Sequence, residues 1–407
     1  MNKFIQKTRI GYFPQDWKTV PLGKICHIWD CLHATAPIEK EKTPWMYLAN
    51  WNIDEEGFID LQGVRYLSKE NYLEWTRRER PKEGDLVFSH EAPIGPVAII
   101  PKGLNIALGR RLLHFRIHAY VINEYLKYFL LIQPVQKYML RNSDGTTVIR
   151  LGIEETKNIE ITFPKEQEQQ KIVSILLNID KLIIKTQEII ILKKIIKKGL
   201  IQILFTKGIG NTEFNQVKLE NPAEWKMISL KNYVEFIRGT EPGSASYINT
   251  GEGTRFIRVG DLNKRNNIYT TSNNLVLVDE DDILLSLDGS PGIVKRGFKG
   301  AISSGIRKLN IIKPELLNQE YLFYVLQTEQ VQKTIFKFTT GITIKHATRA
   351  INHIKIPLPS LAEQEQVASY LLKIDNQIEN EIKLKKTLKI IKKGLMQLLL
   401  RKEKSFS

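Results

Sequence analysis

IIKKGLIQIL at Ile195–Leu204 returns 195 residues later as IIKKGLMQLL at Ile390–Leu399, with eight of ten positions identical. A match this close in two distant parts of one chain indicates an internal duplication. In each copy apolar residues recur at steps of four and three, as on a helix that presents one apolar face; they are Ile196, Leu200 and Ile203 in the first, and Ile391, Leu395 and Leu398 in the second. Each copy therefore predicts the same helical unit.

The duplication extends upstream from these two segments. At the same spacing of 195 residues, the following positions match: Pro164 with Pro359, Glu168-Gln169 with Glu363-Gln364, and Asp180 with Asp375. Further upstream, Gly145 matches Gly341 at a spacing of 196, and Asp85 matches Asp282 at 197. A period this long indicates two tandem domains and not a solenoid of short repeats.

Each copy begins with a globular region and ends with a helical one. The globular regions combine strands around Gly/Pro turns with helical spacing, which predicts an α+β fold for each. Thr206–Asn215, rich in Gly, Thr and Asn, is the predicted linker. The expected parts are a first module at 1–163, a central helical region and linker at 164–210, a second module at 211–358 and a distal helical region at 359–407.

Apolar residues recur in both helical regions at steps of mostly three, four or seven, as a coiled coil requires. Such a long stripe must be buried, and the nearest equivalent surface is the other copy. Helices related by a two-fold axis across their length run antiparallel, so we expect the modules at opposite ends and mutually inverted. The predicted helix–helix interface consists of Ile172, Leu176, Ile179, Ile183, Ile196, Leu200, Val367, Leu371, Ile374, Ile378, Ile391 and Leu395.

The chain of 407 residues is basic, with a formal net charge of +16 and a pI near 9.5. An excess of this size favours a polyanionic partner, either nucleic acid or an anionic membrane surface. No run of about twenty apolar residues could span a bilayer, and the first residues lack the apolar core of a secretory signal. We therefore expect a cytoplasmic protein that binds nucleic acid and has no membrane partner.

Two cysteines exclude a disulfide framework, but they lie close to two histidines. Cys26, His27, Cys31 and His33 are possible zinc ligands. Their spacing fits no common zinc module well, and the second copy has Val234, Glu235 and Gly239 in their places. We expect no metal site, because a cysteine and a histidine at a strand end explain the pattern.

The sequence lacks the usual apparatus of an enzyme that acts on nucleic acid. No GxxxxGK[ST] loop occurs, and no serine, histidine or cysteine motif nominates a nucleophile. Glu55-Glu56 and Asp279–Asp282 could bind magnesium, yet only Asp85 and Asp282 coincide between the copies, each at the start of a strand. We infer that the chain has no catalytic residues and binds no cofactor of its own.

Basic and hydroxyl side chains beside strands and glycine turns are the candidates for DNA contact. Arg110-Arg111 and Arg307-Lys308 flank strands in places that correspond on the sequence, and the turns at 145–150 and 341–346 precede each helix-entry strand. Such side chains can reach phosphates or guanine edges, or can simply be solvated. The candidates are His90, Arg110, Arg111, Thr146, Thr147, Arg150, Lys295, Arg296, Arg307, Lys308, Thr343, Lys345 and His346.

The whole chain resembles the specificity subunit of type I restriction–modification systems. The motifs that carry this resemblance are FPKEQEQQKIVSILLNID with IIKKGLIQIL in the middle, and LPSLAEQEQVASYLLKID with IIKKGLMQLLL at the end. They look like the central and distal conserved regions of that family. GDLVFSHEAPIG and DDILLSLDGSPG resemble a strand-turn-strand element of its target recognition domains.

The resemblance implies that each module reads one half of a bipartite, asymmetric sequence in double-stranded DNA, while the paired helices set the spacer. It also implies assembly with two methyltransferase subunits and with restriction/translocase subunits. S-adenosylmethionine, ATP and Mg²⁺ would then belong to those partners. The alternatives are a stand-alone pseudo-symmetric DNA endonuclease, and a coiled-coil assembly protein that binds DNA without sequence preference.

Overall fold

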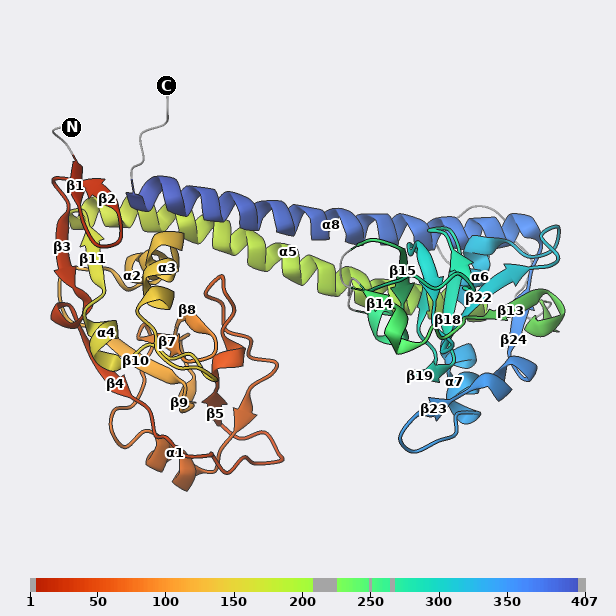
Figure 1. Ribbon diagram of the computed structural model, residues 1–407, viewed down its shortest axis with the longest axis horizontal. Helices are drawn as coiled ribbons and strands as arrows, with labels where there is room; N and C mark the ends of the chain where they lie inside the picture. The colour runs from red at the N-terminus through yellow and green to blue at the C-terminus, as the bar shows by residue number, and fades with distance from the viewer. Residues whose placement is uncertain (1–4, 208–224, 249–250, 264–267, 402–407) are drawn as a thin grey trace. The chain divides into compact units, whose positions relative to one another are not determined.

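The computed structural model describes residues 5–207, 225–248, 251–263 and 268–401 (Figure 1). The chain forms two compact units, one of Met1–Gln187 with Lys383–Ser407 and one of Glu188–Ile382. Each unit thus joins one module and the first part of its own long helix to the last part of the other long helix. The predicted linker Thr206–Asn215 lies, beyond Lys207, outside the described residues.

Two larger sheets, two two-stranded sheets and four short α-helices make up the described part of the first module. A four-stranded sheet has the order β4-β10-β7-β8, and a three-stranded sheet has the order β6-β5-β9. Its strands are β1 (Ile5–Lys7), β2 (Tyr12–Pro14), β3 (Lys18–Pro21), β4 (Cys26–Asp30), β5 (Trp45–Leu48), β6 (Arg65–Tyr66), β7 (Leu86–His90), β8 (Ile94–Ile99), β9 (Asn105–Leu108), β10 (Leu112–Ile117) and β11 (Glu160–Phe163). Its helices are α1 (Lys69–Trp75), α2 (Asn123–Leu131), α3 (Gln133–Arg141) and α4 (Ile153–Lys157).

The second module repeats this plan. The order β13-β22-β18-β20 matches the first four-stranded sheet, and a five-stranded sheet has the order β14-β16-β15-β21-β17. Its strands are β12 (Lys226–Ser229), β13 (Val234–Arg238), β14 (Tyr247–Ile248), β15 (Thr254–Ile257), β16 (Tyr269–Thr270), β17 (Leu277–Val278), β18 (Ile283–Ser286), β19 (Asp288–Gly289), β20 (Val294–Lys295), β21 (Gly300–Ile302), β22 (Ile306–Ile311), β23 (Lys345–His346) and β24 (Lys355–Leu358). Its helices are α6 (Gln319–Val325) and α7 (Glu329–Lys337).

In each module, the segment predicted to be helical forms two successive helices, α2 and α3 in the first module and α6 and α7 in the second. Pro134 lies in the first turn of α3, where its missing N–H costs nothing. In the second module Thr328 precedes α7 in an extended conformation and makes the same break without a proline. The duplicated α+β plan predicted from the sequence is therefore confirmed.

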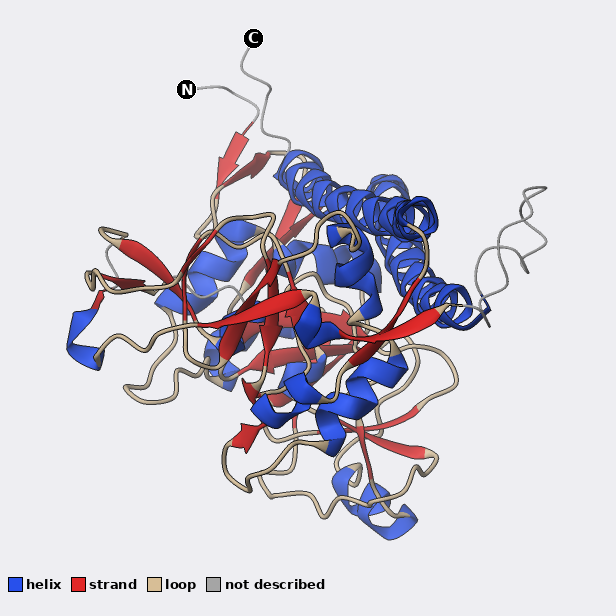
Figure 2. Ribbon diagram, turned by 90° about the vertical axis from the view of Figure 1, so that its right-hand side faces the viewer, coloured by secondary structure: helices blue, strands red, loops and turns tan. Residues whose placement is uncertain are grey.

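Each module continues into one long helix, α5 (Glu166–Lys207) or α8 (Leu361–Arg401), and both are uninterrupted (Figure 1). Figure 2 shows the same helices, in blue, nearly end-on. The repeated glutamines fix their starts. The Gln169 amide donates to the carbonyls of Tyr120 and Pro164, both at 2.9 Å. The Gln364 amide donates to the carbonyls of Leu316 and Pro359 at 2.9 and 3.0 Å. This shared contact explains why Glu-Gln recurs at the same place in each copy.

The long helices pack against each other within each unit. In the first unit, Ile172 and Leu176 near the start of α5 share an apolar cluster with Met396 and Leu400 near the end of α8, and Leu395 packs against it. In the second unit, Ile201 and Leu204 share a cluster with Val367 and Leu371, and Leu200 packs against it. In both units the start of one helix lies beside the end of the other, which confirms the antiparallel pairing. The inversion of the two modules stays a prediction.

Two residues of the predicted helix–helix interface lie outside it. The side chains of Ile196 and Ile391 are 57% and 43% exposed. Lysines take the seam positions instead: Lys197 and Lys392, the next residues along each helix, are half-buried and fully buried, respectively. The remaining predicted positions, including Ile179, Ile183, Ile374 and Ile378, are buried or half-buried.

The seam lysines form ion pairs that follow the duplication. In the second unit the Nζ of Lys197 lies 2.7 Å from the Asp375 carboxylate, which also accepts a hydrogen bond from the Tyr324 hydroxyl at 2.9 Å. In the first unit the Nζ of Lys392 lies 2.6 Å from the Asp180 carboxylate. That carboxylate accepts from the Tyr128 hydroxyl at 2.7 Å. The same Tyr–Asp–Lys contact therefore joins module and helices in each unit.

Candidate nucleic-acid interface

Each module projects one tight hairpin loop, at residues 145–150 and 341–346. Gly145 and Gly341 both have positive φ, +114° and +96°. A Cβ on Gly145 would lie 2.2 Å from the Val148 carbonyl oxygen, and one on Gly341 would lie 2.1 Å from that of Ile344. Since only glycine tolerates this backbone, the repeated glycine specifies the same loop twice.

Both loops are closed by the same backbone hydrogen bonds. The N–H and C=O of Asp144 pair with those of Arg150 at 2.9 and 2.8 Å, and Thr340 pairs with His346 at the same two distances. Arg150 also forms a bridge to Glu91, which anchors the first loop beside β7. In the second module β23 pairs with β19.

The predicted loop residues all lie at the surface. Every side chain from 145 to 150 and from 341 to 346 is exposed. The loops present hydroxyls and cations, and Ile342 at the second tip is 101% exposed. Threonine hydroxyls and basic groups on a rigid turn are suited to contact phosphates and base edges. The loop candidates are Thr146, Thr147, Arg150, Thr343, Lys345 and His346.

Three other candidates make contacts within the modules, and two of them are buried. His90 is fully buried, and its Nδ1 lies 3.0 Å from the Leu151 carbonyl; burial lowers the pKa of this histidine. Arg307 is 2% exposed and donates to the carboxylate of Asp288 at 3.2 Å and the Ser304 carbonyl at 2.7 Å. Lys308 lies 2.8 Å from the Asp282 carboxylate. His90 and Arg307 therefore lie in the core of their modules, and we do not propose them as DNA contacts.

Lys295 and Arg296 in the second module are half-buried. The Arg296 guanidinium pairs with Glu320 and lies 4.6 Å from the centre of the Phe323 ring. This arginine therefore ties β20 to α6. A side chain that is already paired and stacked is a poor candidate for reading bases.

The strand register changes one correspondence inferred from the sequence. Leu112 in β10 pairs with Ser89 of β7, as Ile306 in β22 pairs with Ser286 of β18. Arg110-Arg111 therefore correspond to Ser304-Gly305 and not to Arg307-Lys308.

Arg307-Lys308 instead correspond to Leu113-His114. His114 binds Asp85 at 2.7 Å, as Lys308 binds Asp282 at 2.8 Å. The two repeated aspartates also cap the turns before their strands, accepting from the backbone N–H groups of Lys82 and Asp279 at 2.8 Å each. Asp85 and Asp282 thus each bind a side chain on the neighbouring strand and stabilise the turn at the start of their own strand. Their position at the start of a strand agrees with the sequence prediction.

Arg110 and Arg111 line an open cavity of about 260 Å³ in the first module. Arg110 is exposed, and the Nε of Arg111 lies 2.9 Å from the Glu91 carboxylate. Trp51 and Arg65 line the same cavity, and the Arg65 guanidinium lies 5.1 Å from the centre of the Trp51 ring. Neither Trp51 nor Arg65 is among the residues predicted from the sequence. The sequence feature that points to this place is a tryptophan in a strand-turn segment.

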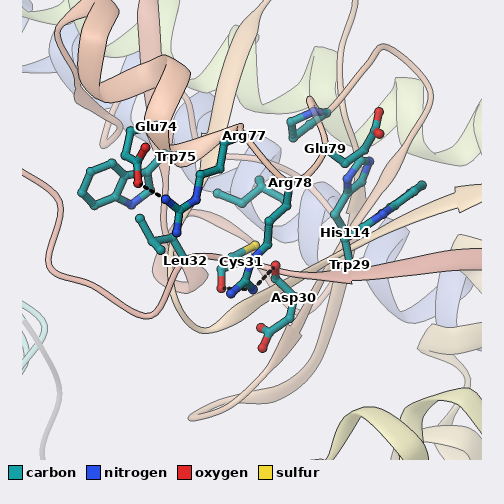
Figure 3. A pocket seen from close by; sticks show the side chains of 12 residues that line it. Trp29, Asp30, Cys31, Leu32, Glu74, Trp75, Arg77, Arg78, Glu79 and His114 are labelled. Atoms are coloured by element: carbon teal, nitrogen blue, oxygen red, sulfur yellow. Dashed lines mark hydrogen bonds and ion pairs between the residues drawn. The ribbon is translucent and has the colours of Figure 1, made fainter.

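A second cavity of the first module, shown in Figure 3, is a weaker candidate because it holds only about 20 Å³. Its cations are already engaged. Arg77 pairs with Glu74 at 2.7 Å, and Arg78 donates to the carbonyls of Asp30 and Cys31 at 2.9 and 3.2 Å (Figure 3). The arginines of this cavity therefore connect the end of α1 to the end of β4 and are not free to bind a ligand.

The four residues considered as zinc ligands do not converge. Cys26 and Cys31 are buried, and the Cys26 thiol donates to the Leu22 carbonyl at 3.3 Å. Burial raises the pKa of Cys26 to about 12 and raises that of Cys31 further. His33 pairs with Asp30 at 2.7 Å. Among the described residues no group of three or more His, Cys, Asp or Glu side chains is placed to hold a metal ion.

Three of the acidic residues weighed as magnesium ligands are in ion pairs: Glu56, Asp279 and, as described above, Asp282. Glu56 binds Lys389 at 3.0 Å, and Asp279 binds Lys299 at 3.3 Å.

None of the described helices is both long enough and apolar enough to cross a membrane.

The family model of the type I restriction modification DNA specificity domain matches this chain twice, at residues 14–194 and 222–389. The chain belongs to the family of type I restriction–modification specificity subunits. The putative type I restriction enzyme MjaX specificity subunit of Methanocaldococcus jannaschii is 32% identical over 412 residues, which cover 97% of this chain and 95% of that protein. The MjaVIII specificity subunit of the same organism is 30% identical over 299 residues, covering 68% and 69%.

Solved structures of the family share the fold. The type I specificity subunit from M. genitalium gives a TM-score of 0.55 at 15% identity and covers 98% of this chain and 97% of that one. A chain from a study of complex assembly and conformational transition in a type I restriction–modification system gives 0.51 at 18% identity, covering 96% and 98%. Specificity subunits target DNA and are not the catalytic subunits of their systems, so the endonuclease alternative is not favoured.

Proposed function

We propose that this specificity subunit reads a bipartite, asymmetric sequence in double-stranded DNA, one half with each module. The observation that carries the proposal is the pair of hairpin loops. They share one backbone conformation but differ in sequence. TTVIR in the first loop and ITIKH in the second offer different donors from equivalent positions. Because base readout depends on the donor and acceptor pattern of the side chains, the two half-sites should differ.

The proposed DNA contacts in the first module are the loop residues with Arg110 and Arg111. In the second module they are Thr343, Lys345 and His346. Arg110 and the loop cations are exposed, as phosphate contacts need to be. The antiparallel helices would set the length of the unread spacer, because an uninterrupted pair of helices fixes a distance better than a flexible linker does.

We also propose that two methyltransferase subunits dock on equivalent apolar positions of the long helices. Ile195 and Ile390 are each 63% exposed, and their neighbours Ile196 and Ile391 are 57% and 43% exposed. Exposed apolar side chains that recur at one helix position mark an interaction surface more than isolated ones do. Two copies of one surface suit two copies of one partner.

Restriction/translocase subunits would join the same complex, in the cytoplasm. The partners would supply S-adenosylmethionine, ATP and Mg²⁺. Two observations support this assignment of the cofactors to the partners. Glu56, Asp279 and Asp282, three of the magnesium candidates, are in ion pairs, and the relatives are specificity subunits.

The function is tested by co-expressing the chain with its methyltransferase in a methylation-free host and mapping the modified adenines. We expect a motif of two unlike halves around a fixed gap. Thr147→Ala with Arg150→Ala should change only one half of the motif, and Thr343→Ala with Lys345→Ala only the other. An uninterrupted palindrome, or methylation without any motif, would refute the proposal.

The docking surface is tested by Ile195→Asp with Ile196→Asp, and separately by Ile390→Asp with Ile391→Asp. Each pair should reduce the recovered complex from two methyltransferase subunits to one, measured by native mass spectrometry. Gln170→Asp is the control, because it adds a charge at another exposed position of α5. Full assembly by both double variants would contradict the proposed surface.

A further inference from the structure

The cavity beside Arg110 has the composition of a nucleotide site. It lies between the loop at 34–38, the turn after β5, strand β6 and the turn before β10. Its lining contains three arginines and two aromatic residues and no acidic side chain; these are Arg65, Arg110, Arg111, Tyr47 and Trp51. A concave surface that is cationic and aromatic at once suits a ligand with a phosphate and a flat ring.

Trp51 supplies the flat surface. Its side chain is 58% exposed, which is unusual for so large an apolar group. The Arg65 guanidinium lies 5.1 Å from the ring centre, a cation–π distance. A base that enters the cavity can therefore stack on an aromatic ring or on a guanidinium plane, both of which bind any base through its π-face.

Arg110 and Arg65 supply free positive charge. Within the part of the chain that the structure describes, neither has an acidic partner within ion-pair distance, whereas Arg111 is partly neutralised by Glu91. Two uncompensated guanidinium groups beside one cavity favour a phosphate. Glu91 also bridges to Arg150, so the cavity adjoins the hairpin loop of the same module.

The second module has the same backbone but a different surface at this place. The Asn52 side chain accepts from the Ala49 N–H at 3.0 Å, and that of Asp261 accepts from the Arg258 N–H at 2.9 Å. Trp51 therefore corresponds to Gly260.

The neighbouring turn is matched in the same way. The N–H groups of Gly109 and Ser303 donate to the carbonyls of Leu48 and Ile257 at 2.8 and 2.9 Å. Arg110 and Arg111 therefore correspond to Ser304 and Gly305. The nucleotide-like lining is thus peculiar to the first module.

We propose that this cavity binds one nucleotide unstacked from the DNA half-site that the first module reads, with its base against Trp51 and its phosphate at Arg110 and Arg65. The proposal rests on the proposed function. A base inside a duplex cannot reach a side chain in a cavity, so the nucleotide must leave the stack. The contacts with Trp51 and the arginines would offset the loss of stacking.

The experiment uses the assembled methyltransferase complex and duplexes that carry one fluorescent base analogue, 2-aminopurine or pyrrolo-cytosine, at each position in turn except the methylated adenines. Unstacking raises the fluorescence of these analogues. We expect one position in the first half-site to brighten on binding, and no position in the second. Trp51→Ala should abolish the rise and weaken binding roughly ten- to a hundredfold, the scale of one base–aromatic stack.

Two further variants separate this role from a loss of folding. Tyr12→Ala is the matched control, because Tyr12 is also an aromatic residue of the first module with 58% exposure, and it should leave the rise unchanged. Ala34→Leu keeps Trp51 and the arginines but fills part of the cavity, and it should abolish the rise.

Several outcomes would overturn the inference. One is a complex that methylates its motif normally while no analogue brightens, and another is a rise that survives in Trp51→Ala. Saturable binding of free deoxyadenosine monophosphate in the absence of any brightening would assign the cavity to a dissolved nucleotide. Loss of methyltransferase assembly in Trp51→Ala would assign it to a protein contact. If the wild-type complex methylated no specific motif, the proposed function itself would fail.

Discussion

Asp180 holds together three parts of the first unit, so its replacement by asparagine is a sharp test of the fold. The carboxylate is 6% exposed and binds the ammonium groups of Lys392 at 2.6 Å and Lys127 at 3.2 Å, besides the Tyr128 hydroxyl. The two lysines are themselves only 2% and 7% exposed. Asp180→Asn keeps the shape of the side chain and removes the charge that both cations face.

The expected cost follows from leaving buried charge uncompensated. Removing one partner of a buried ion pair destabilises by about 3–5 kcal/mol. The carbonyl of Glu56, which accepts from Lys392 at 2.7 Å, limits the loss. The matched control is Asp375→Asn in the second unit, where Asp375 and Lys197 are 29% and 18% exposed; that pair should cost about 1 kcal/mol because water screens it.

The assay is denaturant unfolding followed by tryptophan fluorescence. Five of the six tryptophans belong to the first unit, so the fluorescence reports mainly on that unit; they are Trp17, Trp29, Trp45, Trp51 and Trp75. Amide hydrogen exchange then follows each unit separately. Equal losses in Asp180→Asn and Asp375→Asn would refute the reasoning.

The pH dependence gives a second readout of the same site. Burial lowers the pKa of Lys392 below its ordinary value of 10.5, although Asp180 raises it in part. The unfolded chain therefore binds more protons than the folded one between the folded pKa and 10.5, and stability rises with pH in that window. Asp180→Asn removes the raising charge, so its deficit should shrink as the pH approaches 10. A deficit that is constant between pH 7 and 10 would contradict this account.

Four further substitutions test other parts of the structure. Gly145→Val should abolish recognition of one half-site while changing the melting temperature little, because its Cβ would meet a carbonyl in an exposed loop; motif mapping measures this, and Gly341→Val should affect the other half. Arg307→Met should destabilise the second unit by about 3 kcal/mol without a selective loss of base readout, as hydrogen exchange and methylation would report.

Asp85→Asn should make the free energy of unfolding of the first unit depend less on pH below pH 4, as acid-induced unfolding would measure. Burial raises the pKa of Asp85, but hydrogen bonds from His114 and Arg116 lower it more, to about 2; stability present above pH 3.8 is thus lost as the pH falls toward 2.

The duplication made most of the fold predictable. Identical glutamines, aspartates and glycines at one spacing indicated equivalent structures, and each proved to have an equivalent contact: Gln169 with Gln364 at the helix starts, and Gly145 with Gly341 in the loops. A repeated residue marks a repeated backbone requirement, which a single sequence can reveal.

The errors have two physical causes. Apolar spacing alone places Ile196 in the seam of the long helices and leaves Lys197 out of it. Lysine carries a long aliphatic stem that can lie in a seam while its ammonium group meets an acid. The second error is the correspondence of Arg110 with Arg307, which assumes one constant spacing between the two copies. The connection between β7 and β10 is longer than that between β18 and β22, and only the strand pairing reveals this difference.

Trp51 and Arg65 escaped notice for a different reason. Neither residue belongs to a periodic pattern, and the second copy has Gly260 in the place of Trp51, so neither periodicity nor duplication points to them. Only the pairing of β5 with β6 brings their segments together.

The burial of both cysteines has a practical consequence for observing this protein at work. A thiol reacts as its thiolate, and Cys26 and Cys31 are both enclosed and kept protonated. The native chain is therefore nearly inert to maleimide dyes. Cysteines introduced at Thr147 and Thr343 would be the reactive ones, so a donor and an acceptor dye could report by energy transfer how far apart the loop tips lie before and after DNA is bound.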